Sequence, residues 1–88
     1  MEFEFDPGKS ESNRRKHGID FVEAQELWDD EAHCLLAART GDEPRFAIIA
    51  RWRGSHWTGI FTIRGKRLRI ISVRRARDEE KDIYNQGQ

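Results

Sequence analysis

The sequence predicts an α+β domain: an antiparallel sheet of four or five strands with two N-terminal helices and a C-terminal helix, in the order β-α-α-β-β-β-β-α. Helix-capping signals and helical spacing fall in the first third of the chain. From residue 33 to residue 74 the apolar residues recur at every second position, and two glycine-containing tight turns separate the later strands. Strands joined by such turns must run antiparallel.

The first third of the chain is expected to form a short strand and two helices. Residues 1–5 alternate phenylalanine with glutamate, as a half-buried strand does. Asp6 is a good N-cap, so a helix is predicted over Pro7–His17 that ends at Gly18. A second helix is predicted over residues 20–28. Its buried face comprises Phe21, Ala24, Leu27 and Trp28.

Four strands and a last helix are expected in the remainder. The strands are predicted over residues 33–39, 45–53, 56–64 and 67–74, and the helix over residues 77–86. Gly54-Ser55 is predicted to form a type II′ turn, and Gly65-Lys66 a second tight turn. The last strand has Leu68 and Ile70 on one side and Ile71 and Val73 on the other, so a central strand covered on both faces is expected.

The two faces of the predicted sheet differ in chemistry. One face takes the aromatic residues and packs against the second helix. The other is expected to be open and able to hold an RNA backbone. It is lined by Arg45, Arg51, Arg53, Thr58, Thr62 and Arg64.

Charge is unevenly distributed along a chain whose formal net charge is zero. Residues 1–38 carry 4 basic and 10 acidic residues, residues 39–77 carry 11 and 2, and residues 78–88 carry 1 and 4. A strongly cationic middle therefore lies between anionic ends. Because the local field attracts a polyanion, this pattern favours a phosphate-bearing partner, although arginines that only solvate a sheet would give it too.

Length and composition restrict the class of protein. The 88 residues fit a single domain, 1–88, with a thin core for which a stabilising partner is expected. The single cysteine, Cys34, excludes an internal disulfide and fits a cytoplasmic protein. With no leader and no long apolar run, no membrane association is expected. His33, Cys34 and His56 lack zinc spacing, so neither metal nor cofactor is expected.

Five motifs between Phe3 and Tyr84 have an order and spacing that resemble those of the BrnT toxins. They are Phe3-x-Phe5-Asp6-Pro7-x-Lys9, Asn13-x-x-Lys16-His17-Gly18-Ile19-x-Phe21-x-x-Ala24, Glu43-Pro44-Arg45-Phe46, Arg69-Ile70-Ile71-Ser72-Val73-Arg74-Arg75-Ala76 and Glu80-Lys81-x-x-Tyr84. The resemblance implies a RelE-like fold and a ribonuclease toxin. It also implies a ribbon-helix-helix antitoxin of the BrnA type, a heterotetramer, and promoter DNA bound only through that antitoxin.

RNA carries its own nucleophile, because its 2′-hydroxyl can attack the adjacent phosphorus. The attack needs a proton acceptor, charge stabilisation and a proton donor, which side chains can supply without a metal. Lys16 and His17 are the first candidates, since an imidazole can serve as acid or base. At the end of its helix, His17 either takes part in this chemistry or only caps the last carbonyls.

The remaining candidates divide into catalytic and RNA-binding residues. Arginine offers a fork that matches two phosphate oxygens. Glu80 acts either as a base or as a lock for a nearby arginine, and Tyr84 either contacts RNA or packs the last helix. The catalytic set is Lys16, His17, Arg45, Arg74, Glu80 and Tyr84, and the RNA-binding set is Lys9, Asn13, Arg51 and Arg69.

This mechanism requires His17 and the arginines to converge on one accessible cleft. The alternative function is a non-catalytic module, such as a diverged toxin, that binds nucleic acid or a partner without turnover.

Overall fold

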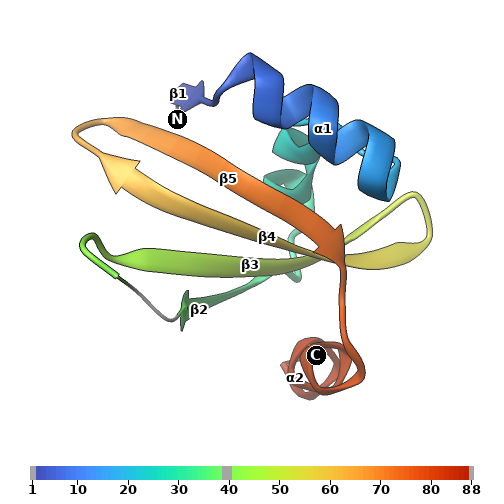
Figure 1. Ribbon diagram of the computed structural model, residues 1–88. Helices are drawn as coiled ribbons and strands as arrows, with labels where there is room; N and C mark the ends of the chain where they lie inside the picture. The colour runs from blue at the N-terminus through green and yellow to red at the C-terminus, as the bar shows by residue number, and fades with distance from the viewer. Residues whose placement is uncertain (1, 39–40, 88) are drawn as a thin grey trace.

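The computed structural model describes residues 2–38 and 41–87 and confirms the α+β class. Two helical segments cover one side of a five-stranded sheet, and a third lies on the other side (Figure 1). Met1 and Arg39, which belong to two predicted strands, lie outside the described residues. The elements are β1 (Glu2–Glu4), α1 (Pro7–His17), η1 (Glu23–Asp29), β2 (Cys34–Ala38), β3 (Arg45–Trp52), β4 (Ser55–Arg64), β5 (Arg67–Arg75) and α2 (Asp78–Gln86).

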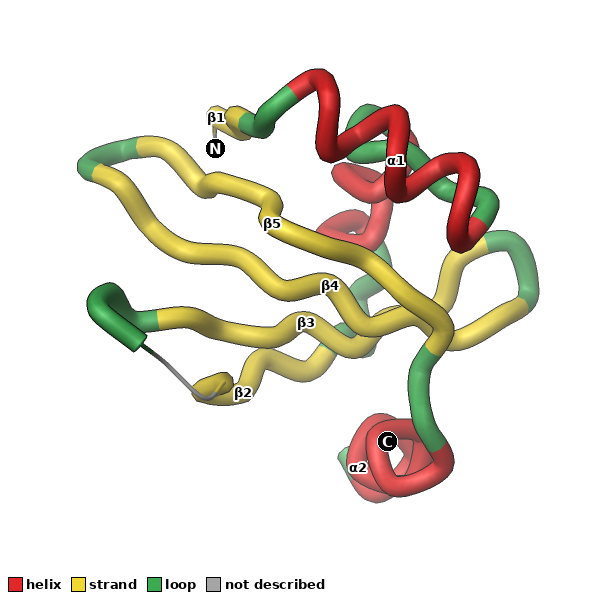
Figure 2. Tube along the Cα trace, in the orientation of Figure 1, coloured by secondary structure: helices red, strands yellow, loops and turns green. Residues whose placement is uncertain are grey.

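The sheet has the strand order β1-β5-β4-β3-β2 and is mixed (Figure 2). The pairs β2–β3, β3–β4 and β4–β5 are antiparallel, as predicted. β1 runs parallel to β5, so the prediction of a wholly antiparallel sheet is wrong. A tight turn imposes an antiparallel pair, but no turn joins β1 to β5 and their relative direction is set by the fold.

Helix α1 has the predicted bounds because both of its ends are specified locally. The Asp6 carboxylate accepts hydrogen bonds from the Gly8 and Lys9 amides, and Gly18 ends the helix with φ 82°. The helix has almost no apolar residue and is held by buried polar groups instead. Ser10 Oγ accepts from the Phe21 amide at 2.9 Å, and Asn13 binds two backbone groups.

Asn13 joins α1 to the sheet. It is 7% exposed, its Nδ2 donates to the Ile19 carbonyl at 2.9 Å, and its Oδ1 accepts from the Val73 amide at 3.1 Å. The predicted RNA-binding residue therefore lies at an internal junction rather than on the surface. It satisfies the Val73 amide on the side of β5 that β1 is too short to cover.

We expect Asn13→Ala to lower the free energy of unfolding by about 2–4 kcal/mol, because each of two backbone groups left unpaired costs roughly 1–3 kcal/mol. Urea unfolding followed by circular dichroism measures the loss. Arg15→Ala, an exposed site on the same helix, should change the value by less than about 0.5 kcal/mol. Equal stability of the two variants would contradict this role of Asn13.

The second helical segment, η1, is a 3-10 helix rather than the predicted α-helix. In the turn that leads into it, the Asp20 carboxylate accepts from the Glu23 amide at 2.7 Å and the Glu23 carboxylate accepts from the Asp20 amide at 3.1 Å. Its buried residues Ala24 and Leu27, together with Phe21 two residues before it, recur at every third position and are 0% exposed. A 3-10 helix has three residues per turn and aligns these side chains better than an α-helix would.

The first hairpin turn is shifted by one residue from its prediction. Trp52 pairs with Ser55, so the turn residues are Arg53 and Gly54, with φ of 49° and 82°. Positive φ at both positions is typical of a type I′ turn, whereas a II′ turn was predicted. Arg53 is placed over the Trp52 ring at 4.3 Å. The second turn, Gly65-Lys66, is confirmed.

A β-bulge changes the faces of β5. Phe61 pairs with Ile70 and Gly59 with Val73, so β5 contains one residue more than β4 between these pairs. Leu68, Ile70 and Val73 consequently all face the core, and the predicted alternation is wrong. The strand does lie between two neighbours, as expected.

The core lies between the sheet and η1, on the face with Trp52, Trp57 and Phe61, as predicted. On the other face α2 covers one end of the sheet. There Thr58 is 0% exposed and hydrogen-bonded to α2, so this part of the face is not open as predicted.

Candidate functional site

The first turn of α2 is fixed on the sheet by Glu80. Its carboxylate accepts two hydrogen bonds from Arg74, at 2.7 and 3.0 Å. Thr58 Oγ1 donates to it at 3.0 Å and the Arg77 amide at 2.8 Å. A side chain of β4, one of β5 and the N-cap of α2 therefore meet at a single carboxylate.

These contacts keep both Glu80 and Arg74 ionised. The hydrogen bonds from Arg74 dominate and, with those from Arg77 and Thr58, lower the pKa of Glu80 to about 2, although burial opposes them. The same contact raises the pKa of Arg74. A carboxylate with such a pKa is a weak proton acceptor at neutral pH. Of the two interpretations of Glu80, its geometry favours the lock for Arg74.

The lowered pKa of Glu80 predicts a pH-dependent stability. Its charged form contributes stability above the ordinary pKa of 4.5, and the contribution disappears as the pH falls toward about 2. The shift corresponds to roughly 3 kcal/mol at most. We expect Glu80→Gln to be less stable than the parent by the full difference above pH 5, and the two to converge near pH 2.

Urea unfolding at a series of pH values measures this difference. Glu79→Gln is the matched control, since Glu79 lies in the same turn and is exposed. A stability difference for Glu80→Gln that is independent of pH would contradict the ionic contribution.

Tyr84, one turn beyond Glu80, fixes α2 to the segment before β2. It is 5% exposed, and its hydroxyl donates to Asp30 Oδ2 at 2.8 Å. Burial, with the contact to Asp30, raises the pKa of Tyr84 to about 12. Burial also acts to raise the pKa of Asp30, but hydrogen bonds from Arg51, Ala32 and Tyr84 outweigh it and lower that pKa. This geometry favours packing of the last helix as the role of Tyr84.

A cavity of about 210 Å³ lies between the β3–β4 turn and the start of α2. A water occupies roughly 30 Å³, so the cavity has room for a phosphate group. Three basic side chains line it and no acidic one does. The lining residues are Gly54, Ser55, His56, Arg75, Ala76 and Lys81.

His56 is placed in this cavity wall by contacts from two residues near the C-terminal end of the chain. Its carbonyl accepts from the Ala76 amide at 3.0 Å, and its ring packs edge-on against Tyr84 with centroids 4.9 Å apart. Within the described residues its Nε2 is buried and has no hydrogen-bond partner. The Arg75 guanidinium lies 4.8 Å from the Trp57 ring centroid, which restricts its position. An imidazole thus lines the same cavity as two cations.

The structure brings together only some of the predicted catalytic residues. Arg74, Glu80 and Tyr84 meet where α2 packs on the sheet. Lys16 and His17 are exposed at the end of α1, on the opposite side of the sheet from α2 (Figure 1). Neither forms a hydrogen bond or ion pair through its side chain with another described residue. The single cleft expected for His17 and Arg74 is not formed.

The remaining predicted residues are spread over the surface. Lys9 is exposed on α1, and Arg51 is exposed at the far end of β3, where its amide donates to Asp30 at 2.8 Å. Arg45 is exposed at the beginning of β3. Arg69 pairs with Glu4 at 3.7 Å. Of these, Arg51 is next to the cavity, since it pairs across the hairpin with His56.

Sequence reasoning missed the residues that line the cavity. His56 was considered only as a zinc ligand, because its neighbours Arg75, Lys81 and Tyr84 are distant in sequence. Lys81 did carry a signal, since it belongs to the closing motif with Glu80 and Tyr84.

Two further features concern metals and membranes. Within residues 2–38 and 41–87, no three His, Cys, Asp or Glu side chains are grouped as metal ligands would be. None of the described helices has the length and apolar character needed to span a membrane.

One protein family matches most of the chain. The family described as the ribonuclease toxin BrnT of type II toxin–antitoxin systems matches residues 5–80 of the 88-residue chain. The match begins directly after β1 and ends at Glu80, in the first turn of α2. A search of curated proteins gives no match. Because the family match spans most of its length, the chain belongs to the BrnT family of type II toxin–antitoxin ribonuclease toxins.

Proposed function

We propose that this chain is a cytoplasmic endoribonuclease toxin that cleaves RNA without a metal, by attack of the 2′-hydroxyl on the adjacent phosphorus. Family membership supports the ribonuclease activity. The observation that carries the mechanism is the cavity in which His56 is combined with Arg75 and Lys81 and with no acidic side chain. It offers a proton acceptor and two cations at one place.

In this mechanism the scissile phosphate occupies the cavity. The His56 imidazole accepts the 2′-hydroxyl proton on Nδ1, since Nε2 is buried, as the bond from the 2′-oxygen to phosphorus forms. The Lys81 ammonium donates a proton to the 5′-oxygen as its bond to phosphorus breaks. Arg75 and Lys81 stabilise the charge of the phosphorane between the two steps. The products are a 2′,3′-cyclic phosphate and a 5′-hydroxyl.

The flanking phosphates follow the cationic side chains of the same region. Arg51 is exposed beside the cavity and contacts the nearest flanking phosphate, whereas Arg45, at the opposite end of β3, and Arg69, paired with Glu4, lie away from it. Arg74 is paired with the ionised Glu80 through two hydrogen bonds, so its charge is neutralised and we assign it no contact with the RNA. In this proposal Lys9, Lys16 and His17 lie away from the reacting phosphate, and we assign no catalytic role to them.

The proposed regulation follows from the family. A type II toxin has an antitoxin partner, and the motifs resemble toxins neutralised by ribbon-helix-helix antitoxins. We therefore expect a BrnA-like partner, assembled with this RelE-like toxin as a heterotetramer that binds promoter DNA through the antitoxin.

Expression in bacteria tests the function. We expect the chain alone to stop growth and degrade cellular RNA, and co-expression of the adjacent open reading frame to restore both. Soluble, folded protein that leaves growth and RNA intact would overturn the proposal. If that protein bound RNA without turnover, with a salt dependence that tracks its phosphate contacts, the binding module would be the correct function.

A further inference from the structure

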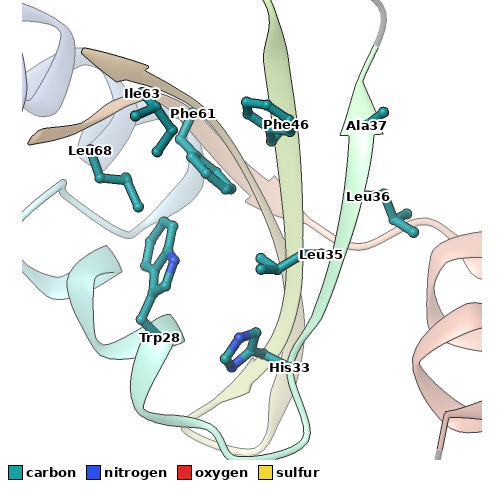
Figure 3. Close-up of a pocket in the computed structure, with 9 residues that line it drawn as sticks. All are labelled: Trp28, His33, Leu35, Leu36, Ala37, Phe46, Phe61, Ile63 and Leu68. Atoms are coloured by element: carbon teal, nitrogen blue, oxygen red, sulfur yellow. The ribbon is translucent and has the colours of Figure 1, made fainter. Parts of the chain in front are cut away.

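An apolar groove of about 640 Å³ lies on the η1 side of the sheet (Figure 3). It lies at the other end of β4 from the cavity. Trp28 forms one wall, and Leu35 of β2 faces it across the groove, while Leu36 points away toward the other side of the sheet. Leu35 is 57% exposed and Ile63 is 48% exposed. The lining residues are Trp28, His33, Leu35, Leu36, Ala37, Phe46, Phe61, Ile63 and Leu68.

The groove lies beside an open edge of the sheet. β2 is the last strand in the order β1-β5-β4-β3-β2, so no described strand pairs with its outer side. An unpaired edge presents a row of backbone donors and acceptors to another chain. A strand added there would lie about 4.8 Å from β2, and every second side chain would point toward the groove.

We propose that this edge and groove together bind an extended segment of the antitoxin. The segment adds a sixth strand next to β2 and places alternate apolar side chains between Trp28 and Leu35. Main-chain pairing supplies affinity and the groove selects the side chains. The inference rests on the proposed toxin–antitoxin function, but it concerns a surface remote from the cavity.

The side chains in and around the groove indicate what kind of segment binds there. No lysine or arginine lines the groove, so an RNA backbone would find no fixed counter-charge inside it. Lys66 is exposed in the turn between β4 and β5, two residues before the lining residue Leu68, and forms no ion pair with another described residue. The structure therefore favours a protein segment with alternating apolar residues and an acidic flank that reaches Lys66.

The position of the groove has a consequence for inhibition. Along β4 the cavity lies near Ser55 and the groove lies near Phe61 and Ile63, at the two ends of the strand. A segment bound in the groove anchors the antitoxin without entering the cavity. Silencing the ribonuclease then requires a second part of the antitoxin, or a change transmitted through the sheet.

Co-expression with the product of the adjacent open reading frame tests this inference. We expect Leu35→Asp and Ile63→Asp to weaken the purified complex by about 10- to 100-fold in Kd, the effect of removing one well-buried apolar contact. Val22→Asp is the matched control, because Val22 is 61% exposed and lies outside the groove. Hydrogen exchange should show protection of the β2 amides in the complex.

Each of the following results would contradict the inference. Normal binding by Leu35→Asp and Ile63→Asp, or protection confined to α2, would place the antitoxin elsewhere. Dimerisation of the chain alone that is abolished by Leu35→Asp would assign the edge to a second copy. An adjacent region without a partner gene would also contradict it. Since binding is measured without RNA, failure of ribonuclease activity would be seen separately.

Discussion

Replacement of His56 by alanine is expected to lower the rate of RNA cleavage by about 10²–10⁴-fold, the range for loss of a general acid–base group. His56 is the imidazole that lines the cavity with Arg75 and Lys81. Its removal leaves the two cations and therefore phosphate binding, so the loss should be in kcat more than in KM. Single-turnover cleavage of a short labelled RNA measures the effect.

His17→Ala provides the matched comparison. It removes the same side chain from the exposed end of α1 and should leave the cleavage rate within about twofold, since a group outside the site contributes no transition-state interaction. Circular dichroism must show both variants folded. Full activity of His56→Ala together with loss of activity in His17→Ala would restore the interpretation made from the sequence and refute the cavity as the site.

Replacement of Arg75 by alanine is expected to lower kcat by about 10²–10³-fold, because a fixed donor at the developing phosphorane charge is lost. Arg75 is held over the Trp57 ring at 4.8 Å and lines the cavity. Arg75→Lys should recover only part of the rate, since an ammonium keeps the charge but not the planar fork. The same RNA cleavage assay measures the three rates.

Arg53→Ala controls for loss of a stacked arginine. Arg53 lies 4.3 Å from the Trp52 ring centroid and does not line the cavity. The Arg53→Ala variant should keep nearly full RNA-cleavage activity. An equal fall in rate for Arg53→Ala and Arg75→Ala would indicate a general loss of positive field rather than a specific contact with the reacting phosphate.

The parts of the fold that sequence predicts well are those that neighbouring residues determine. Asp6 and Gly18 lie at the two ends of α1, and its bounds are correct. Gly65-Lys66 joins β4 to β5 directly, and their antiparallel pairing is correct. The first turn lies one residue earlier than predicted because Arg53 adopts positive φ, which is uncommon for a residue with a side chain.

The errors arise where distant segments meet. Nothing within residues 2–4 indicates that β1 pairs parallel with β5, 65 positions later in the register. The bulge that turns Val73 toward the core depends on the fit between β4 and β5. The role predicted for a polar residue was wrong for the same reason. Asn13 looked available for RNA because its partner, the Val73 amide, lies 60 residues away.

The candidate site could be predicted only in part, because it too depends on contacts between distant segments. Motif resemblance selected Arg74, Glu80 and Tyr84, which the structure places together, but their contacts favour holding α2 over performing the reaction. The cavity needs the β3–β4 turn, the end of β5 and the start of α2 at one place. No local pattern encodes that arrangement, so His56 carried no signal of its own.

The central claim is that RNA binds at the α2 end of the sheet. Titration of the ¹⁵N-labelled protein with a short 2′-O-methyl RNA, which lacks the attacking hydroxyl, tests it most directly. The account predicts that amide resonances of Ser55, His56 and Arg75 to Lys81 shift on binding. Shifts confined to the end of α1, around Lys16 and His17, would contradict it.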